Sequence, residues 1–165
     1  MKTLGMIEQV PRMLGVQAAG VAPIASAFET GKCERGRDGN TYADSINVPV
    51  PRNWRKAVNA VRDSRGAYVT VTDREIMRAV GLCGRLSGVF AEPAAAAAVA
   101  GVAAARHGGI MDERADVVVM ITGNGLKDVP GALRALGQPH DIRPDLSDVA
   151  RVLERSGGDN PSEPE

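Results

Sequence analysis

We expect the rest of this chain to be organised around the stretch ADVVVMITGNGLKD, residues 115–128. Its residues 117–121 form an unbroken apolar run that is too short for a typical helix and rich in β-branched side chains, so it predicts a strand buried on both faces. The TGNG turn at 122–125 then places a hydroxyl, an amide and bare backbone N–H groups at the carboxyl end of that strand. Open α/β sheets bind ligands at this end of their strands, so the turn is a candidate site.

A structural explanation of the TGNG turn competes with the functional one. Gly-X-Gly after a strand often serves only to relieve strain where the backbone needs a positive φ angle. The turn alone therefore does not establish a ligand site, and the segments that precede it in the chain have to be considered with it.

Three such segments occur in a particular order: VQAAGVAPI at 16–24, ADSINVPVPRN at 43–53 and GVFAEPAAAAAVAG at 88–101. Together with ITGNGLKD at 121–128 they closely resemble threonine synthase, a pyridoxal-phosphate (PLP) enzyme of the fold-type II class. The resemblance covers about residues 1–129. It implies an α/β fold, a three-layer sheet with helices on both faces, as part of the tryptophan synthase β-like architecture.

The resemblance also implies PLP as the cofactor and gives Thr122 a role. This residue matches the family position whose hydroxyl faces the pyridine nitrogen of the cofactor. A threonine at a strand end beside a glycine is physically suited to approach the edge of a ring. Glu92, in the family's EP pair, either lies near the cofactor or is explained by the favourable position of an acid at a helix N-terminus; both explanations remain open.

The chain lacks other parts that the family uses. There, the Schiff-base lysine, the asparagine facing the cofactor's 3-hydroxyl and the Gly-rich phosphate loop precede the segments resembled here. The lysines of this chain lie in other contexts: Lys2, Lys32, Lys56 and Lys127. We therefore expect residues 1–155 to be the C-terminal part of a PLP-dependent catalytic domain, inactive alone, with either an N-terminal half that carries the lysine and phosphate loop or further copies of itself as partner.

The family reaction implied is the conversion of O-phospho-L-homoserine and water to L-threonine and phosphate, a carbon–oxygen lyase activity. The TGNGLKD, ADSI and PRN motifs fit threonine synthase better than the tryptophan synthase β-type or dehydratase turns, but a relative such as cysteate synthase remains an alternative. Two further alternatives belong to other classes. The chain could be a noncatalytic assembly or binding subunit, or a gene fragment with no role alone.

Composition restricts the function classes further. The 165 residues are 44% hydrophobic and carry 20 basic and 20 acidic residues, which predicts one folded domain and argues against nucleic-acid or membrane partners. The alanine-rich run at 94–105 is too short to span a bilayer. Cys33 and Cys83 are isolated, which indicates reduced thiols in the cytoplasm and no metal site; Cys83 lies in a helical apolar stripe and is expected to be a packed thiol.

Local patterns predict the order of the elements. Strands are expected at 14–18 and 67–72, and a charged surface loop at 29–40. The last ten residues, 156–165, are expected to form a disordered acidic tail. The helices and the signals that predict them are Pro23 before 24–28, Asn53 as N-cap, Thr72 with Glu75 as a capping box, Pro93 to His107, a short helix at Pro130, and a final helix with Leu146, Val149 and Leu153.

Overall fold

A computed structural model describes residues 1–34 and 39–158, with side chains through Glu154. The strands are β1 (Leu14–Ala18) and β2 (Ala67–Val71). The helices are α1 (Pro23–Thr30), α2 (Trp54–Asp63), α3 (Asp73–Ser87), α4 (Pro93–His107), α5 (Val129–Leu136) and α6 (Leu146–Gly158). Short 3-10 helices are η1 (Lys2–Leu4), η2 (Asp44–Ile46) and η3 (Gly125–Asp128).

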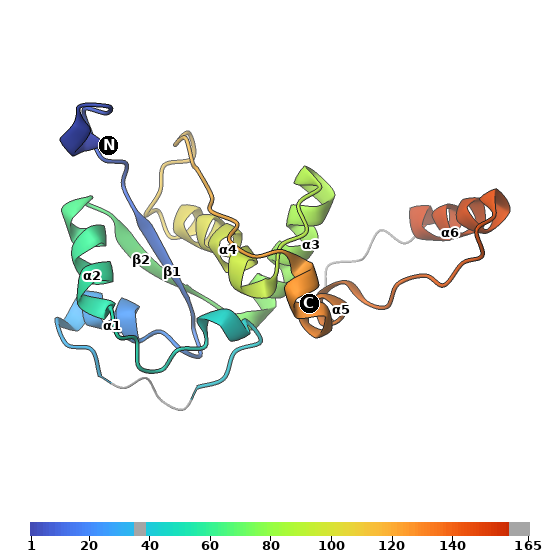
Figure 1. Ribbon diagram of the computed structural model, residues 1–165, viewed down its shortest axis with the longest axis horizontal. Helices are drawn as coiled ribbons and strands as arrows, with labels where there is room; N and C mark the ends of the chain where they lie inside the picture. The colour runs from blue at the N-terminus through green and yellow to red at the C-terminus, as the bar shows by residue number, and fades with distance from the viewer. Residues whose placement is uncertain (35–38, 159–165) are drawn as a thin grey trace.

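The strands β1 and β2 are parallel and form the middle of three layers (Figure 1). Helices α1 and α2 lie on one face of the strands, and α4 lies on the other with α3 packed outside it. The crossover from β1 to β2 through α1 and α2 is the connection that parallel strands require. The α/β fold with helices on both faces is thus confirmed.

Alternation along the strands decides which side chains face which layer. Tyr68 points towards α1, where its ring lies 5.3 Å from the ring of Phe28. Gly15, paired with Tyr68 across the strands, leaves the space that this ring fills, since a Cβ there would overlap it. Val16 points the opposite way and packs against α4. The face of the sheet towards α1 therefore carries a large aromatic side chain, and the face towards α4 carries a smaller aliphatic one.

The helix α4 approaches the sheet closely because its buried residues are small. It begins at Pro93, as predicted, and its buried face is made almost entirely of alanine and glycine. At Gly101 a Cβ would overlap the side chain of Val16 on β1. This close approach places the N-terminal end of α4, with Glu92 before it, beside the turn at 122–125.

The capping box predicted at the start of α3 is present. The Thr72 hydroxyl accepts a hydrogen bond from the Glu75 amide, and the Glu75 carboxylate accepts from the Thr72 amide at 2.6 Å. Asn53 occupies the predicted N-cap of α2 but makes no capping hydrogen bond with its side chain. The surface loop predicted at 29–40 starts after Thr30, because α1 extends to that residue. Residues 35–38 of this loop lie outside the described residues.

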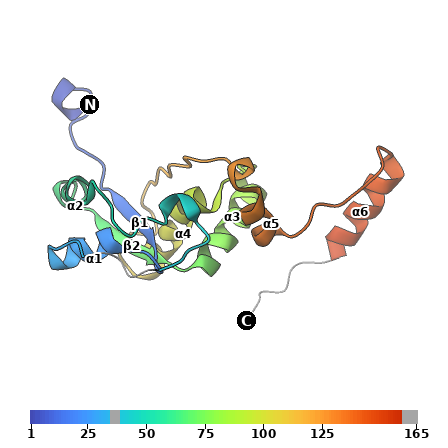
Figure 2. The same cartoon turned by 60° about the horizontal axis from the view of Figure 1, so that its bottom comes forward.

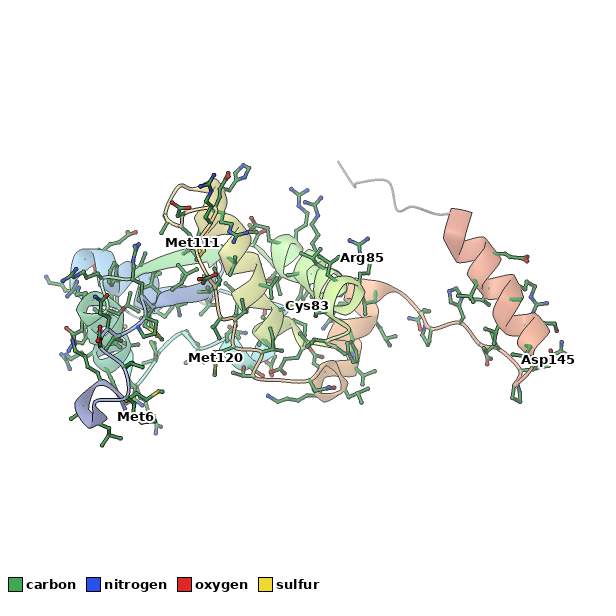
Figure 3. All side chains as sticks on the ribbon, turned by 90° about the horizontal axis from the view of Figure 1, so that it is seen from above. Met6, Cys83, Arg85, Met111, Met120 and Asp145 are labelled. Carbon is green, nitrogen blue, oxygen red and sulfur yellow. The ribbon has the colours of Figure 1, made fainter. Side chains whose placement is uncertain are left out.

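The strand predicted at 117–121 is wrong in this structure. These residues are extended but belong to no sheet among the described residues, and their exposure alternates: Val117, Val119 and Ile121 are half-buried, while Val118 is 90% and Met120 71% exposed. Figure 3 shows the segment carrying Met120 running alongside α4. The apolar run predicts a doubly buried strand, but only one of its faces is covered here.

The C-terminal elements extend away from the layers. Helix α5 packs on α3, whereas α6 stands apart from the body at the end of an extended connection (Figure 2). Both helices agree with the sequence-based expectation. Helix α6 continues to Gly158, so residues 156–158 are helical where the sequence predicts the start of a disordered tail. The remaining tail, 159–165, lies outside the described residues.

Candidate cofactor site

The turn at 122–125 is fastened to the residues that lead into α4. The Glu92 amide donates to the Gly123 carbonyl at 3.0 Å, and the Gly125 amide donates to the Phe90 carbonyl at 2.8 Å. Between these two bonds, Ala91 and Asn124 form an antiparallel bridge. These bonds hold the turn beside the N-terminus of α4, although the segment before it pairs with no strand among the described residues.

The two glycines of the turn serve close approach. Neither Gly123 nor Gly125 has a positive φ angle, so relief of backbone strain does not explain them. A Cβ on Gly125 would overlap the ring of Phe90, and a Cβ on Gly123 would overlap the carboxylate of Glu92. Relief of backbone strain, the structural explanation considered from the sequence, is therefore wrong for these two glycines. They make room for neighbouring side chains instead.

Glu92 is the N-cap residue of α4, yet its side chain makes no capping hydrogen bond. The residue is 4% exposed, and its Oε1 lies 3.4 Å from Nζ of Lys127. A buried carboxylate needs such a partner, since removing an unpaired charge from water is costly. Glu92 thus faces the turn and its lysine, and the helix-dipole explanation alone does not account for its position.

Lys127 reaches Glu92 because of the local geometry of η3. The Asn124 side chain accepts a hydrogen bond from the Leu126 amide at 2.9 Å, which starts the 3-10 turn and directs Lys127 back over it. Nζ of Lys127 also lies 3.2 Å from Oγ of Ser45, at η2. The ADSI and GLKD motifs that contain these two residues are visible in the sequence, but nothing in their spacing along the chain indicates that they meet.

The η2 turn that carries Ser45 is itself anchored. The Thr41 hydroxyl donates to the carboxylate of Asp73 at the start of α3, and the Tyr42 amide donates to the same carboxylate at 3.2 Å. Ala43 is fully buried, and Ile46 packs against the core. Ser45 is therefore presented from a fixed loop.

A cavity of about 520 Å³ lies where η2, the start of α4, η3 and α5 meet. Its lining includes Tyr42, Ser45, Glu92, Lys127 and Arg134. Its size is within the range typical of small-molecule sites, and polar groups of both charges converge on it. It is open on one side, so the described residues form part of a site wall.

Thr122 lies on the edge of this arrangement. The residue is exposed and precedes Gly123, which touches Glu92, but it is not part of the cavity lining. The structure brings Glu92, Ser45 and Lys127 together and leaves the Thr122 hydroxyl on the adjoining surface. Because Thr122 is exposed and is followed by a residue without a side chain, the edge of a planar ring could approach its hydroxyl.

Cys83 and His107 are not among the residues that line the cavity. Cys83 is buried in α3, and burial raises the pKa of its thiol, as expected for a packed cysteine. His107 is exposed in the last turn of α4. Among the described residues, no cluster of histidine, cysteine and acidic side chains could hold a metal ion. Within the same residues, no helix has the length and apolar character needed to cross a membrane.

Comparison with known proteins identifies the family to which this α/β chain belongs. Residues 1–123 match the family described as "Pyridoxal-phosphate dependent enzyme", and the chain belongs to that family. The cofactor of the family is pyridoxal phosphate. A crystal structure of a threonine deaminase from T.th. is similar in fold, with a TM-score of 0.52 and 20% identity, over 71% of this chain and 44% of that one.

Within the family, the curated relatives that the chain matches include threonine synthases. The chain is 40% identical to threonine synthase of Mycobacterium leprae over 153 residues, which is 93% of this chain and 40% of the relative. It is 37% identical to threonine synthase of Methanocaldococcus jannaschii over 90% of this chain and 37% of the relative. The resemblance noted from the motifs is confirmed, and the chain spans about two fifths of the length of these relatives.

Proposed function

We propose that this chain is the C-terminal portion of a threonine synthase and provides the ring-nitrogen end of its PLP site. The complete enzyme would convert O-phospho-L-homoserine and water to L-threonine and phosphate. The observation that carries the proposal is the turn at 122–125, in which Gly123, the residue after Thr122, lies against a buried carboxylate at the N-terminus of α4. The similarity to threonine synthases over nearly the whole chain supports the choice of reaction.

Bound PLP supplies an electron sink for the reaction, while the protein orients it and tunes its electronics. In this proposal the Thr122 hydroxyl hydrogen-bonds the pyridine nitrogen. A neutral hydroxyl does not stabilise a positive charge on that nitrogen as a carboxylate would. The cofactor would then remain a moderate electron sink, which suits selective elimination of the substrate's phosphate.

The proposed partner is an N-terminal part of the same kind of enzyme, carrying the lysine and the phosphate loop. Two surfaces are available to it. Among the described residues β1 pairs only with β2, so its other edge is open, and the segment 117–121 is extended without a strand partner. The exposed side chains of Val118 and Met120 would be covered by such an addition. A homo-oligomer is the rival occupant of these surfaces.

The test is complementation. The chain is mixed with the portion of Mycobacterium leprae threonine synthase that it does not span, and PLP binding and phosphate release are measured. We expect the mixture to bind PLP and to release phosphate, and the chain alone to do neither. Borohydride treatment of the chain alone with PLP should label no lysine stoichiometrically, since Lys127 and the other lysines are outside the family's lysine motif.

Thr122→Val tests the assignment of the hydroxyl within that mixture. The substitution preserves shape and removes one hydrogen bond, which should weaken PLP or transition-state binding by about 1 to 3 kcal/mol, or roughly five- to a hundred-fold. Thr70→Val, at an exposed position of β2, is the matched control and should change neither measurement. Equal PLP affinity and phosphate release in the Thr122→Val and unmodified mixtures would remove Thr122 from the cofactor site.

Phosphate release also separates the alternative functions. A mixture that assembles and binds PLP but releases no phosphate from O-phospho-L-homoserine would favour a noncatalytic subunit or another PLP lyase, such as cysteate synthase. Absence of any complex, with the chain forming a stable homo-oligomer, would contradict the proposed partner.

A further inference from the structure

Three side chains from distant parts of the sequence meet at one wall of the cavity. Nζ of Lys127 lies 3.4 Å from Oε1 of Glu92 and 3.2 Å from Oγ of Ser45. The lysine comes from η3, the glutamate from the start of α4 and the serine from η2. One amine thus joins three of the four segments that surround the cavity.

The burial of the three groups is unequal. The side chain of Glu92 is 6% exposed, whereas that of Lys127 is 62% exposed. Such a largely exposed lysine contributes little to overall stability, because solvent screens its charge and its long side chain loses entropy. The effect of Lys127 on the buried carboxylate is local, since its amine lies 3.4 Å from Oε1 of Glu92.

The position of the carboxylate matters because Glu92 contacts the turn in two ways. Its amide donates to the Gly123 carbonyl at 3.0 Å, and its carboxylate fills the space where a Gly123 side chain would be. Lys127 follows Gly123 by four residues in the same chain segment. The contacts therefore close a ring, from Gly123 through the backbone to Lys127, across the ion pair to Glu92, and back to Gly123.

We propose that Lys127 is a positioning residue: by holding Glu92 and Ser45 together it fixes Gly123, and through Gly123 it sets the place of the Thr122 hydroxyl. The functional half of this inference rests on the function proposed above. The geometric half concerns only contacts within this chain. Lys127 touches neither cofactor nor substrate in this role.

The geometric half is tested in the chain alone by the amide resonances of the turn. Lys127→Met keeps an unbranched side chain only one atom shorter and removes its charge and hydrogen bonds, and Lys127→Arg restores a cation. We expect the Gly123 amide resonance to move in Lys127→Met and to return towards its original place in Lys127→Arg. Lys56→Met, at an exposed position of α2, is the control and should leave it unchanged.

A Gly123 resonance that moves no further in Lys127→Met than in Lys56→Met would overturn the inference. Lys127→Gln gives the same readout should the methionine variant not fold. Since no cofactor is needed for this measurement, it decides the geometric half even where complementation fails and the proposed function falls.

The functional half is tested by PLP affinity in the complemented protein. Lys127→Met should weaken binding roughly two- to tenfold, the lower part of the range of coupling between neighbouring residues. The loss should disappear when Thr122 is already Val, because Lys127 acts through that hydroxyl. Equal losses in both backgrounds would show that Lys127 does not position Thr122, and Lys127→Arg should recover most of the affinity if it does.

Discussion

Replacing Gly101 by alanine tests the packing that places α4 on the sheet. A Cβ at Gly101 would overlap the side chain of Val16, and that side chain is stiff because it is β-branched. Overpacking of this kind costs about 1 to 3 kcal/mol. An alanine in a helix interior gains about 1 kcal/mol over glycine. The net expectation is destabilisation by about 0 to 2 kcal/mol, the difference of these two effects.

Gly84→Ala supplies the control, because Gly84 is also inside a helix but a Cβ there meets no atom within 4 Å. It should show only the gain of about 1 kcal/mol. The two variants should therefore differ by about 1 to 3 kcal/mol in unfolding free energy, or roughly 2 to 12 °C in melting temperature for a chain of this size. Urea unfolding followed by circular dichroism measures the difference.

The result that would refute this reasoning is a Gly101→Ala variant stabilised as much as Gly84→Ala. Val16→Ala provides a further check on the cause. Combined with Gly101→Ala it makes room for the added methyl group, so the double variant should be more stable than the sum of the single effects. Additive effects would mean that Val16 and Gly101 are not in the contact described.

Alkylation at neutral pH should modify Cys33 before Cys83. Burial raises the pKa of both thiols, but Cys83 is buried whereas Cys33 is only partly buried. Equal rates of modification, measured by mass spectrometry, would contradict this prediction. Hydrogen bonds from its helix cap hold the pKa of Glu75 below the ordinary 4.5. The contribution of Glu75 to folding stability is therefore present above that pH and is lost as the pH falls through the lowered pKa. Glu75→Gln should make the unfolding free energy depend less on pH in the acid range, and an unchanged dependence would exclude this origin. Replacing Val118 and Met120 by lysine should reduce binding of a hydrophobic dye to the chain alone, and undiminished fluorescence would place the dye elsewhere.

Much of the fold could be predicted because it depends on signals within a few residues. Pro93 fixes a backbone angle suited to a first helical turn, and Thr72 with Glu75 satisfies orphan amides of α3. The helices that these residues start are confirmed. These signals act locally, so they do not depend on which other segments are present.

The strand at 117–121 could not be predicted in the same way. An apolar run shows that a segment favours burial, but a strand also needs a neighbour to satisfy its backbone. Here Val117 and Ile121 are half-buried, while Val118 and Met120 are exposed.

The site could be predicted in part. Thr122 and Glu92 are indicated by motifs at the end of an apolar run and at a helix start, and the structure brings Glu92 against the glycine that follows Thr122. The contact of Lys127 with Ser45 joins residues 82 positions apart and depends on how η2 is anchored to α3. Neither residue type nor spacing along the chain carries that information.

The stretch 117–121, which pairs with no strand in the part of the chain that the structure describes, favours aggregation during synthesis and storage. An extended, β-branched segment with open backbone groups is a template on which identical segments can stack into intermolecular sheets. The residues just before it, DERAD at 112–116, are mostly charged, and charged flanks of this kind oppose such stacking. Aggregation of the chain should therefore accelerate with added salt, which screens those charges, and slow when a partner covers the segment.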